Sequence, residues 1–209
     1  MVPPSSSLTL TPSMETPDRT EAAREPLPPL AIAKLFASRT VLVFGEVTSA
    51  LAERVTSMLL ALASESDAPI RVLVHSPGGH VESGDSIHDV IRFIEPEVHM
   101  IGTGWVASAA ALLFVAARPE CRFALPNTRF LLHQPLGGAN GRASDIEIEA
   151  RQVLAVRERM NRIFARETNQ PYEKIVADTQ RNFWMNAQQA KEYGLVSRII
   201  ETYDEVGRI

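Results

Sequence analysis

Along the first half of the chain, runs of β-branched residues alternate with stretches in which apolar residues recur at helical spacing. The runs TVLVFG (40–45) and IRVLVHS (70–76) end at turn residues and are typical of buried strands. In the stretch between them, apolar residues lie three or four positions apart: Leu51, Val55, Leu59 and Leu62. This spacing predicts an amphipathic helix with Thr48 or Ser49 as its cap. Repeated β-α units of this kind predict an α/β fold with a largely parallel sheet.

The alternation continues to the end of the chain. We expect, in order, a helix carrying Ile87, Val90, Ile91 and Ile94, a strand EVHMIG, a helix through the apolar stretch that follows it, short strands CRFAL and RFLLHQ, a long helix over 144–168, a short helix over 186–192 and a strand LVSRII. For the short helix, Asn186 is the expected cap, with Gln189 completing a capping box.

The composition changes near residue 30. Seven of the 14 prolines precede this position, whereas the first glycine is Gly45. We expect residues 1–30 to form a disordered or processed tail and residues 31–209 to form one domain. The tail carries several acidic residues and no apolar core, so it does not resemble a secretory signal.

Composition also limits the classes of partner and cofactor. A net charge of −4 gives no reason to expect nucleic acid or an anionic membrane, and no run of about 18 uncharged apolar residues predicts a membrane span. Cys121 is the only cysteine, so we expect no intramolecular disulfide and no cysteine-built metal site. It is interpreted as a small buried apolar residue, and its solitary occurrence fits the reducing cytoplasm.

The apolar stretch GTGWVASAAALLFVAA (102–117) contains Ser108 where a strand could turn into an alanine-rich helix. One interpretation is structural, because serine is a favoured helix cap. The other is chemical, because a serine at such a turn lies beside free N–H groups and the positive helix end. The stretch by itself supports both.

A hydroxyl nucleophile needs a base, a group that orients the base, and N–H donors for the oxyanion. Among five histidines, His133 stands out because LLHQPLGG places it at the end of a buried strand. The motif SPGG (76–79) ends another strand and offers backbone N–H groups without a blocking side chain. From these residues alone a serine hydrolase is one hypothesis, and a capping serine with a core histidine is the commoner arrangement.

Four blocks, HSPGGHVESGDSIHDVIRFI, GWVASAAALL, PNTRFLLHQPLGGANGRASDIEIEARQVL and AKEYGLV, together resemble the proteolytic subunit of the Clp protease family. The resemblance runs from about residue 33 to 203. It implies a crotonase-like α/β fold and heptameric rings stacked in pairs, a tetradecamer that encloses a proteolytic chamber. It also implies a hexameric ATP-dependent AAA+ unfoldase as partner and polypeptides as substrates. ATP would be used by the unfoldase, so no cofactor or metal is implied for this chain.

By position, the resemblance makes Ser108 the nucleophile and His133 the general base. Gly79 and Ala109 would supply the oxyanion N–H groups. The helix that begins near Ser108 would direct its positive end at the oxyanion.

The third triad residue of the family is an aspartate, but the matching stretch here reads DTQRNFWMNAQQAKEYGLVS, which puts Asn182 at that position. Asparagine can accept the imidazole Nδ1 proton only through its carbonyl, and it carries no charge. In trypsin the corresponding change cost roughly 10⁴-fold in turnover. We therefore expect a Ser-His-Asn triad that is slow or conditional.

The resemblance also assigns substrate and partner contacts. The loop containing Leu136 and Gly137 would pair with an extended substrate backbone. Gln180 replaces an acid that pairs across the ring–ring contact in the family, which implies altered stacking. Arg71 and Leu73 stand where the family has aromatic side chains of its unfoldase-docking site, so that site does not carry over directly.

Three hypotheses follow from these residues. The first is a Clp-type serine endopeptidase with the variant triad. The second is a weakly active or inactive paralogue that serves as a structural or regulatory subunit in a mixed ring with a second Clp proteolytic subunit. The third is an acyl-CoA enzyme of the wider crotonase superfamily, which the Ser-His pair and HQPLGG disfavour.

Overall fold

The computed structural model describes residues 27–138 and 140–206. Within these residues, seven strands form one sheet: β1 (Thr40–Phe44), β2 (Ile70–Ser76), β3 (Val98–Ala107), β4 (Arg122–Ala124), β5 (Arg129–Leu132), β6 (Phe183–Asn186) and β7 (Arg198–Ile199). The α-helices are α1 (Pro29–Ala37), α2 (Ser49–Glu65), α3 (Val81–Phe93), α4 (Ala109–Phe114), α5 (Ala143–Thr168), α6 (Tyr172–Asp178) and α7 (Ala187–Tyr193). Two 3₁₀ turns complete the described chain: η1 (Pro119–Cys121) and η2 (Tyr203–Val206).

The sheet branches at its longest strand, β3, because two different strands pair with the two halves of one edge of β3. The main path runs β1-β2-β3-β4-β7, and all of its neighbouring strands are parallel. The first half of β3 pairs with β4 over Met100–Gly102, whereas its second half pairs with β5 over Trp105–Ala107. The last strand of this branch, β6, is antiparallel to β5. The predicted α/β architecture with a largely parallel sheet is confirmed.

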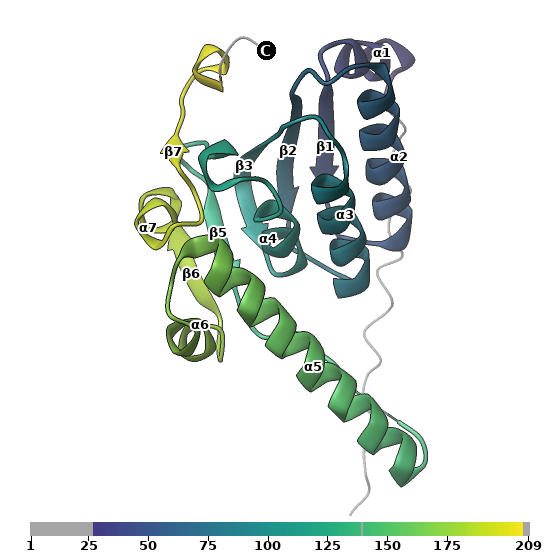
Figure 1. The fold of residues 1–209 in the computed structure, drawn as a ribbon, viewed down its shortest axis with the longest axis vertical. Helices are drawn as coiled ribbons and strands as arrows, with labels where there is room; N and C mark the ends of the chain where they lie inside the picture. The colour runs from purple at the N-terminus through teal and green to yellow at the C-terminus, as the bar shows by residue number, and fades with distance from the viewer. Residues whose placement is uncertain (1–26, 139, 207–209) are drawn as a thin grey trace, which may run out of the picture.

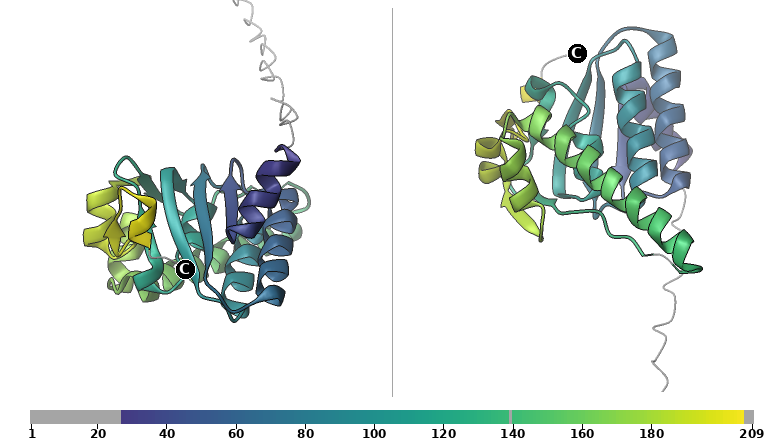
Figure 2. Two further views of the ribbon diagram at one scale, coloured as in Figure 1. Left: turned by 90° about the horizontal axis from the view of Figure 1, so that it is seen from above. Right: turned by 60° about the horizontal axis from the view of Figure 1, so that its bottom comes forward.

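Helices α2, α3 and α4 pack side by side on one face of the sheet, and α1 lies against the edge strand β1 (Figures 1 and 2). The core lies between these helices and the sheet. It is built from β-branched and leucine residues of the strands together with the apolar faces of α2 and α3 and all six residues of α4. Burial of this apolar area is the main contribution to the stability of such a layer.

Helix α5 extends diagonally from the body of the molecule (Figure 1). Its C-terminal part is anchored in the core by Met160 and Phe164, whereas Ile146, Ile148 and Leu154 in its first half are exposed. Among the described residues, none of the helices combines the length and the apolar character needed to cross a membrane.

Both predicted helix caps are confirmed. The Thr48 side chain accepts a hydrogen bond from the Leu51 N–H at the start of α2. The Asn186 side chain accepts from the Gln189 N–H, and the Gln189 side chain accepts in return from the Asn186 N–H, so α7 begins with a full capping box.

The expected helix through the apolar stretch is wrong in its first half. The strand continues through Ala107, and the helix that follows has only six residues, Ala109–Phe114. The reason is that β3 pairs with β2 on one side and with β4 and then β5 on the other, whereas its largely apolar sequence has no period that separates strand from helix.

Among the α-helices and strands described, α1, α6 and β6 were not predicted, and the strand expected over 195–200 is shorter, Arg198–Ile199. Helix α1 begins at Pro29, inside the predicted tail; residues 1–26 lie outside the described residues. These elements are short, and tertiary contacts rather than a local pattern select them.

Arg122 is fully buried at the start of β4. Its guanidinium donates to the carbonyls of Val115 and Ala117 after α4, and to the carbonyl and carboxylate of Glu167 near the end of α5. These acceptors compensate for the loss of hydration, and they tie both helix ends to the sheet.

Candidate active site

Ser108 occupies the single residue between β3 and α4. Its backbone has φ = 57° and ψ = −123°, a positive-φ conformation that is uncommon for a residue with a side chain. The Ser108 N–H donates to the carbonyl of Leu131 at 2.9 Å, and its carbonyl accepts from Ala111 at the same distance. The hydroxyl makes no capping hydrogen bond, so the structural interpretation of this serine as a side-chain cap is wrong. Within the part of the chain that the structure describes, the hydroxyl at this strained turn has no hydrogen-bond partner.

The SPGG motif brings its first glycine against this serine. A Cβ at Gly78, whose φ is +94°, would lie 2.6 Å from the Cβ of Ser108 and 2.7 Å from the carbonyl oxygen of Ala107. No side chain fits at that distance, so Gly78 permits the close approach of β2 and the serine turn.

Gly79 and Ala109 are the two predicted oxyanion donors. Gly79 is held between two hydrogen bonds of Val47, whose N–H donates to the Gly78 carbonyl and whose carbonyl accepts from the His80 N–H, each at 2.8 Å. Within the described chain, the N–H groups of Gly79 and Ala109 have no hydrogen-bond partner. They are therefore free to donate to a bound oxygen.

His133 directly follows β5 and is half-buried. Burial lowers the pKa of its imidazole below the ordinary value of 6.5, because the charged form loses hydration. The ring is consequently neutral at neutral pH, as a general base must be.

Asn182 directly precedes β6 and is exposed. The antiparallel ladder ends with the pair Leu132–Phe183, so His133 and Asn182 are the residues that directly adjoin its last pair. Beyond this point the regular strand pairing ends, and the Gln134 N–H donates to the carbonyl of Thr179 at 2.7 Å.

The fold thus brings Ser108, His133 and Asn182 to adjoining ends of three neighbouring strands. Among the described residues, no hydrogen bond joins the serine to the imidazole or the imidazole to the asparagine amide. Catalytic hydrogen bonds are often long in the absence of substrate. The roles of the three residues stay predictions.

Leu136 and Gly137 lie in the segment after His133, which forms no regular strand. Leu136 is 86% exposed. A Cβ at Gly137 would lie 2.8 Å from Cγ2 of Val153, so this segment runs close against α5. The backbone groups of Leu136 and Gly137 have no hydrogen-bond partners within the described residues, and the predicted pairing with a substrate strand is compatible with this arrangement.

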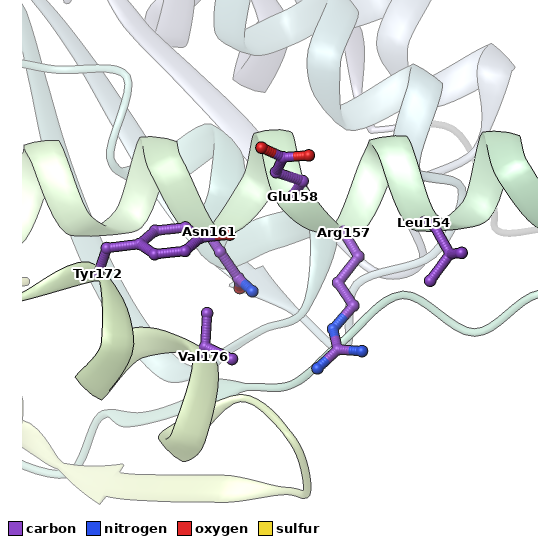
Figure 3. Close-up of a pocket in the computed structure, with 6 residues that line it drawn as sticks. All are labelled: Leu154, Arg157, Glu158, Asn161, Tyr172 and Val176. Carbon is purple, nitrogen blue, oxygen red and sulfur yellow. The ribbon is translucent and has the colours of Figure 1, made fainter.

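A buried polar contact between Thr179, which lies three residues before Asn182, and Asn161 of α5 could not be predicted from the amino-acid sequence. Thr179 is fully buried, and its Oγ1 lies 3.1 Å from Oδ1 of Asn161 and 2.7 Å from the Ile175 carbonyl oxygen. Asn161 also lines a hollow of about 250 Å³ between α5 and α6 (Figure 3). Because the Thr179 carbonyl holds Gln134, this contact links α5 to the strand end that carries His133.

Arg71 and Leu73, the two positions where the resemblance expects aromatic docking residues, contact the C-terminal segment. The Arg71 guanidinium lies 4.4 Å from the ring centroid of Tyr203 and donates to its hydroxyl. Leu73 packs against a small apolar cluster that includes Ile200 and Val206. The C-terminal segment therefore covers this part of the sheet.

Comparison with known proteins gives one family and several close relatives. The family model described as "Clp protease" matches residues 30–203. "ATP-dependent Clp protease proteolytic subunit 3" of Rhizobium etli is 58% identical over 83% of this chain and 90% of the relative. "ATP-dependent Clp protease proteolytic subunit 2" of Pseudomonas aeruginosa is 56% identical over 80% of this chain and 84% of the relative.

Among solved structures, an asparagine-to-aspartate mutant of ClpP1 from Listeria monocytogenes superposes with a TM-score of 0.79. The two are 49% identical, and the match covers 84% of this chain and 99% of the other. This likeness agrees with the crotonase-like fold expected from the sequence motifs.

Proposed function

Since this chain belongs to the Clp protease family, we propose that it is a serine endopeptidase, the proteolytic subunit of an ATP-dependent protease that hydrolyses unfolded polypeptides. The observation that carries the proposal is the turn at Ser108, where a strained backbone leaves the hydroxyl unengaged beside the free N–H groups of Gly79 and Ala109. A capping serine needs neither the strain nor the free donors.

In the acylation step, Oγ of Ser108 forms a bond to the carbonyl carbon of the scissile peptide, and its proton passes to His133. The carbonyl oxygen becomes an oxyanion that accepts hydrogen bonds from Gly79 and Ala109. The C–N bond then breaks, and the proton held by His133 goes to the leaving amine. The products are a free amine and an ester on Ser108.

In the deacylation step, His133 takes a proton from water as the water oxygen attacks the ester. Collapse of the second oxyanion returns the proton to Oγ of Ser108 and releases a carboxylic acid. His133 becomes a cation in both steps. Asn182 can orient the imidazole through its carbonyl, but it supplies no charge to stabilise that cation, so the proposed triad is slow.

We place the chain in heptameric rings that stack in pairs, with polypeptide substrates bound along the loop of Leu136 and Gly137 by strand addition. ATP would be hydrolysed by a hexameric AAA+ unfoldase, so the peptidase reaction requires no cofactor from this chain. Because the Tyr203 ring covers Arg71, we propose that the unfoldase contacts this chain in a way that does not use an aromatic docking site at this position. We assign the complex to the cytoplasm.

A second function is favoured by the neutral side chain at position 182, which no hydrogen bond joins to His133 within the described residues. In this case the chain serves as a weakly active or inactive structural or regulatory subunit, in a mixed ring with a second Clp proteolytic subunit. Co-expression with a standard subunit followed by native mass spectrometry tests it. Rings that contain both chains support this function, and separation into pure rings excludes it.

The endopeptidase proposal is tested by cleavage of fluorogenic peptides by the wild type, Ser108→Ala and Ser144→Ala, the last a control at an exposed serine of α5. We expect Ser108→Ala to abolish cleavage and Ser144→Ala to retain it. Unchanged cleavage by Ser108→Ala would overturn the assignment.

A further inference from the structure

Three side chains with metal-binding atoms converge at the amino end of β3, at the opposite end of the strand from Ser108. They are Glu97, which directly precedes the strand, His99 within it, and Cys121 at the end of η1. One ligand atom from each of these residues lies within 4.8 Å of the other two. Nε2 of His99 lies 2.7 Å from Oε1 of Glu97.

The surroundings hold the three side chains in place. The second oxygen of Glu97 is ion-paired with Arg118, which leaves Oε1 to face His99. The His99 ring packs edge-on against Phe123 with 5.7 Å between ring centroids, and Cys121 is 3% exposed. The Nδ1 atom of His99 is buried and has no hydrogen-bond partner among the described residues, so this nitrogen does not help to orient the imidazole.

The donor set of one thiolate, one imidazole and one carboxylate is typical of Zn²⁺. Zinc bonds of about 2.0–2.3 Å place tetrahedral ligand atoms about 3.5 Å apart, so the cluster needs adjustments of about 1 Å. We propose that Glu97, His99 and Cys121 bind Zn²⁺ and thereby join the amino end of β3 to the η1 turn, with water in the fourth position. On binding, Cys121 releases its thiol proton to solvent and Glu97 exchanges its contact with His99 for the metal. The proton that Nε2 of His99 donates to Glu97 moves to Nδ1, which leaves Nε2 free to ligate.

This site revises the expectation that a single cysteine excludes a cysteine-containing metal site. That expectation holds for sites made of several thiolates, but a mixed donor set needs only one. The proposal concerns stability rather than peptide hydrolysis, because the cluster lies at the end of β3 remote from the Ser108 turn.

The test uses the full chain after treatment with a chelator, titrated with Zn²⁺ in competition with a chromogenic chelator. We expect one Zn²⁺ per chain, and an affinity for Zn²⁺ at least about 100-fold lower in Cys121→Ser and in His99→Gln. Loss of a residue that only hydrogen-bonds a metal ligand already lowers metal affinity by about 10–100-fold, and these two variants each lose a ligand. Zn²⁺ should raise the midpoint of thermal unfolding of the wild type and leave that of the variants unchanged.

Substitution with Co²⁺ identifies the ligand. Because Cys121 is the only cysteine of the chain, a thiolate-to-cobalt charge-transfer band reports on this site alone, and it should vanish in Cys121→Ser. The matched control is His80→Gln, because His80 lies 3.2 Å from Glu82 on the surface without a thiol nearby. Absence of stoichiometric Zn²⁺ in the wild type, or equal affinity in wild type and His99→Gln, would overturn the proposal.

Discussion

Leu132 of β5 lies directly opposite Phe183 of β6 in an antiparallel ladder. The residues next to this pair, His133 and Asn182, therefore lie at adjoining strand ends. In the described part of the chain no hydrogen bond joins them. Asn182, predicted as the third triad residue, thus adjoins the strand end that carries His133, and it has a neutral amide where the proposed mechanism favours a charge.

Replacing Asn182 with aspartate should increase the turnover of peptide substrates. A carboxylate can accept the Nδ1 proton of His133 and stabilise its cation, and the reverse change in trypsin costs about 10⁴-fold. We expect kcat to rise by between about 10-fold and 10⁴-fold. The control is Asn127→Asp, which adds the same charge at an exposed turn. An equal response of the two variants would refute the proposed role of Asn182.

The pH dependence of kcat/KM should have its acid limb below pH 6.5. Burial lowers the pKa of His133 from 6.5, and the protonated ring cannot accept the serine proton, so activity is lost only as the pH falls through that lowered pKa. In Asn182→Asp the nearby negative charge should raise the pKa of His133 and move the limb to higher pH. An acid limb that stays in place in this variant contradicts a contact between the two residues.

Gly78→Ala should impair the peptidase through the serine turn. The added methyl group would lie 2.6 Å from Cβ of Ser108, at a backbone φ of +94°. We expect a loss of at least about 2 kcal/mol in the free energy of unfolding, from steric overlap and left-handed strain, together with loss of cleavage. Gly138→Ala is the stability control, because a Cβ added at Gly138 would have no neighbouring atom within 4 Å among the described residues. Equal stability of the two variants would contradict the close approach.

Thr179→Val should loosen the strand end that carries His133. The change removes the hydroxyl beside Oδ1 of Asn161 and leaves a buried amide without its partner, at a cost of about 1–3 kcal/mol. Because Thr179 supports the segment that contacts Gln134, kcat should fall while KM changes little. Thr56→Val, which removes a hydroxyl bonded within α2, is the control. A decrease in stability without any change in kcat would limit Thr179 to a structural role.

Much of the fold could be predicted because the spacing of apolar residues within single helices and strands is visible over short stretches of sequence. The helical spacing of α2 and the unbroken β-branched runs of β1 and β2 are visible in the sequence, as are the caps Thr48 and Asn186. The turn at Ser108 was located by its change from apolar strand to alanine-rich helix, although β3 proved longer than expected.

What could not be predicted depends on contacts between distant segments. The residues FWMN of β6 become a strand only because β5 offers an edge for pairing, and that pairing brings the segments that carry His133 and Asn182 together. In the same way, nothing near Arg122 indicates that a charged residue is fully buried, since its acceptors come from the end of α4 and from α5.

The central claim is that Ser108 is a nucleophile activated by His133. The most direct test is reaction of the full chain with a fluorophosphonate, followed by mass spectrometry of the intact chain and its peptides. We predict a single adduct on Ser108, formed faster in Asn182→Asp and absent in Ser108→Ala. The absence of an adduct from both the wild type and Asn182→Asp, or equal labelling of Ser108→Ala, would contradict the account.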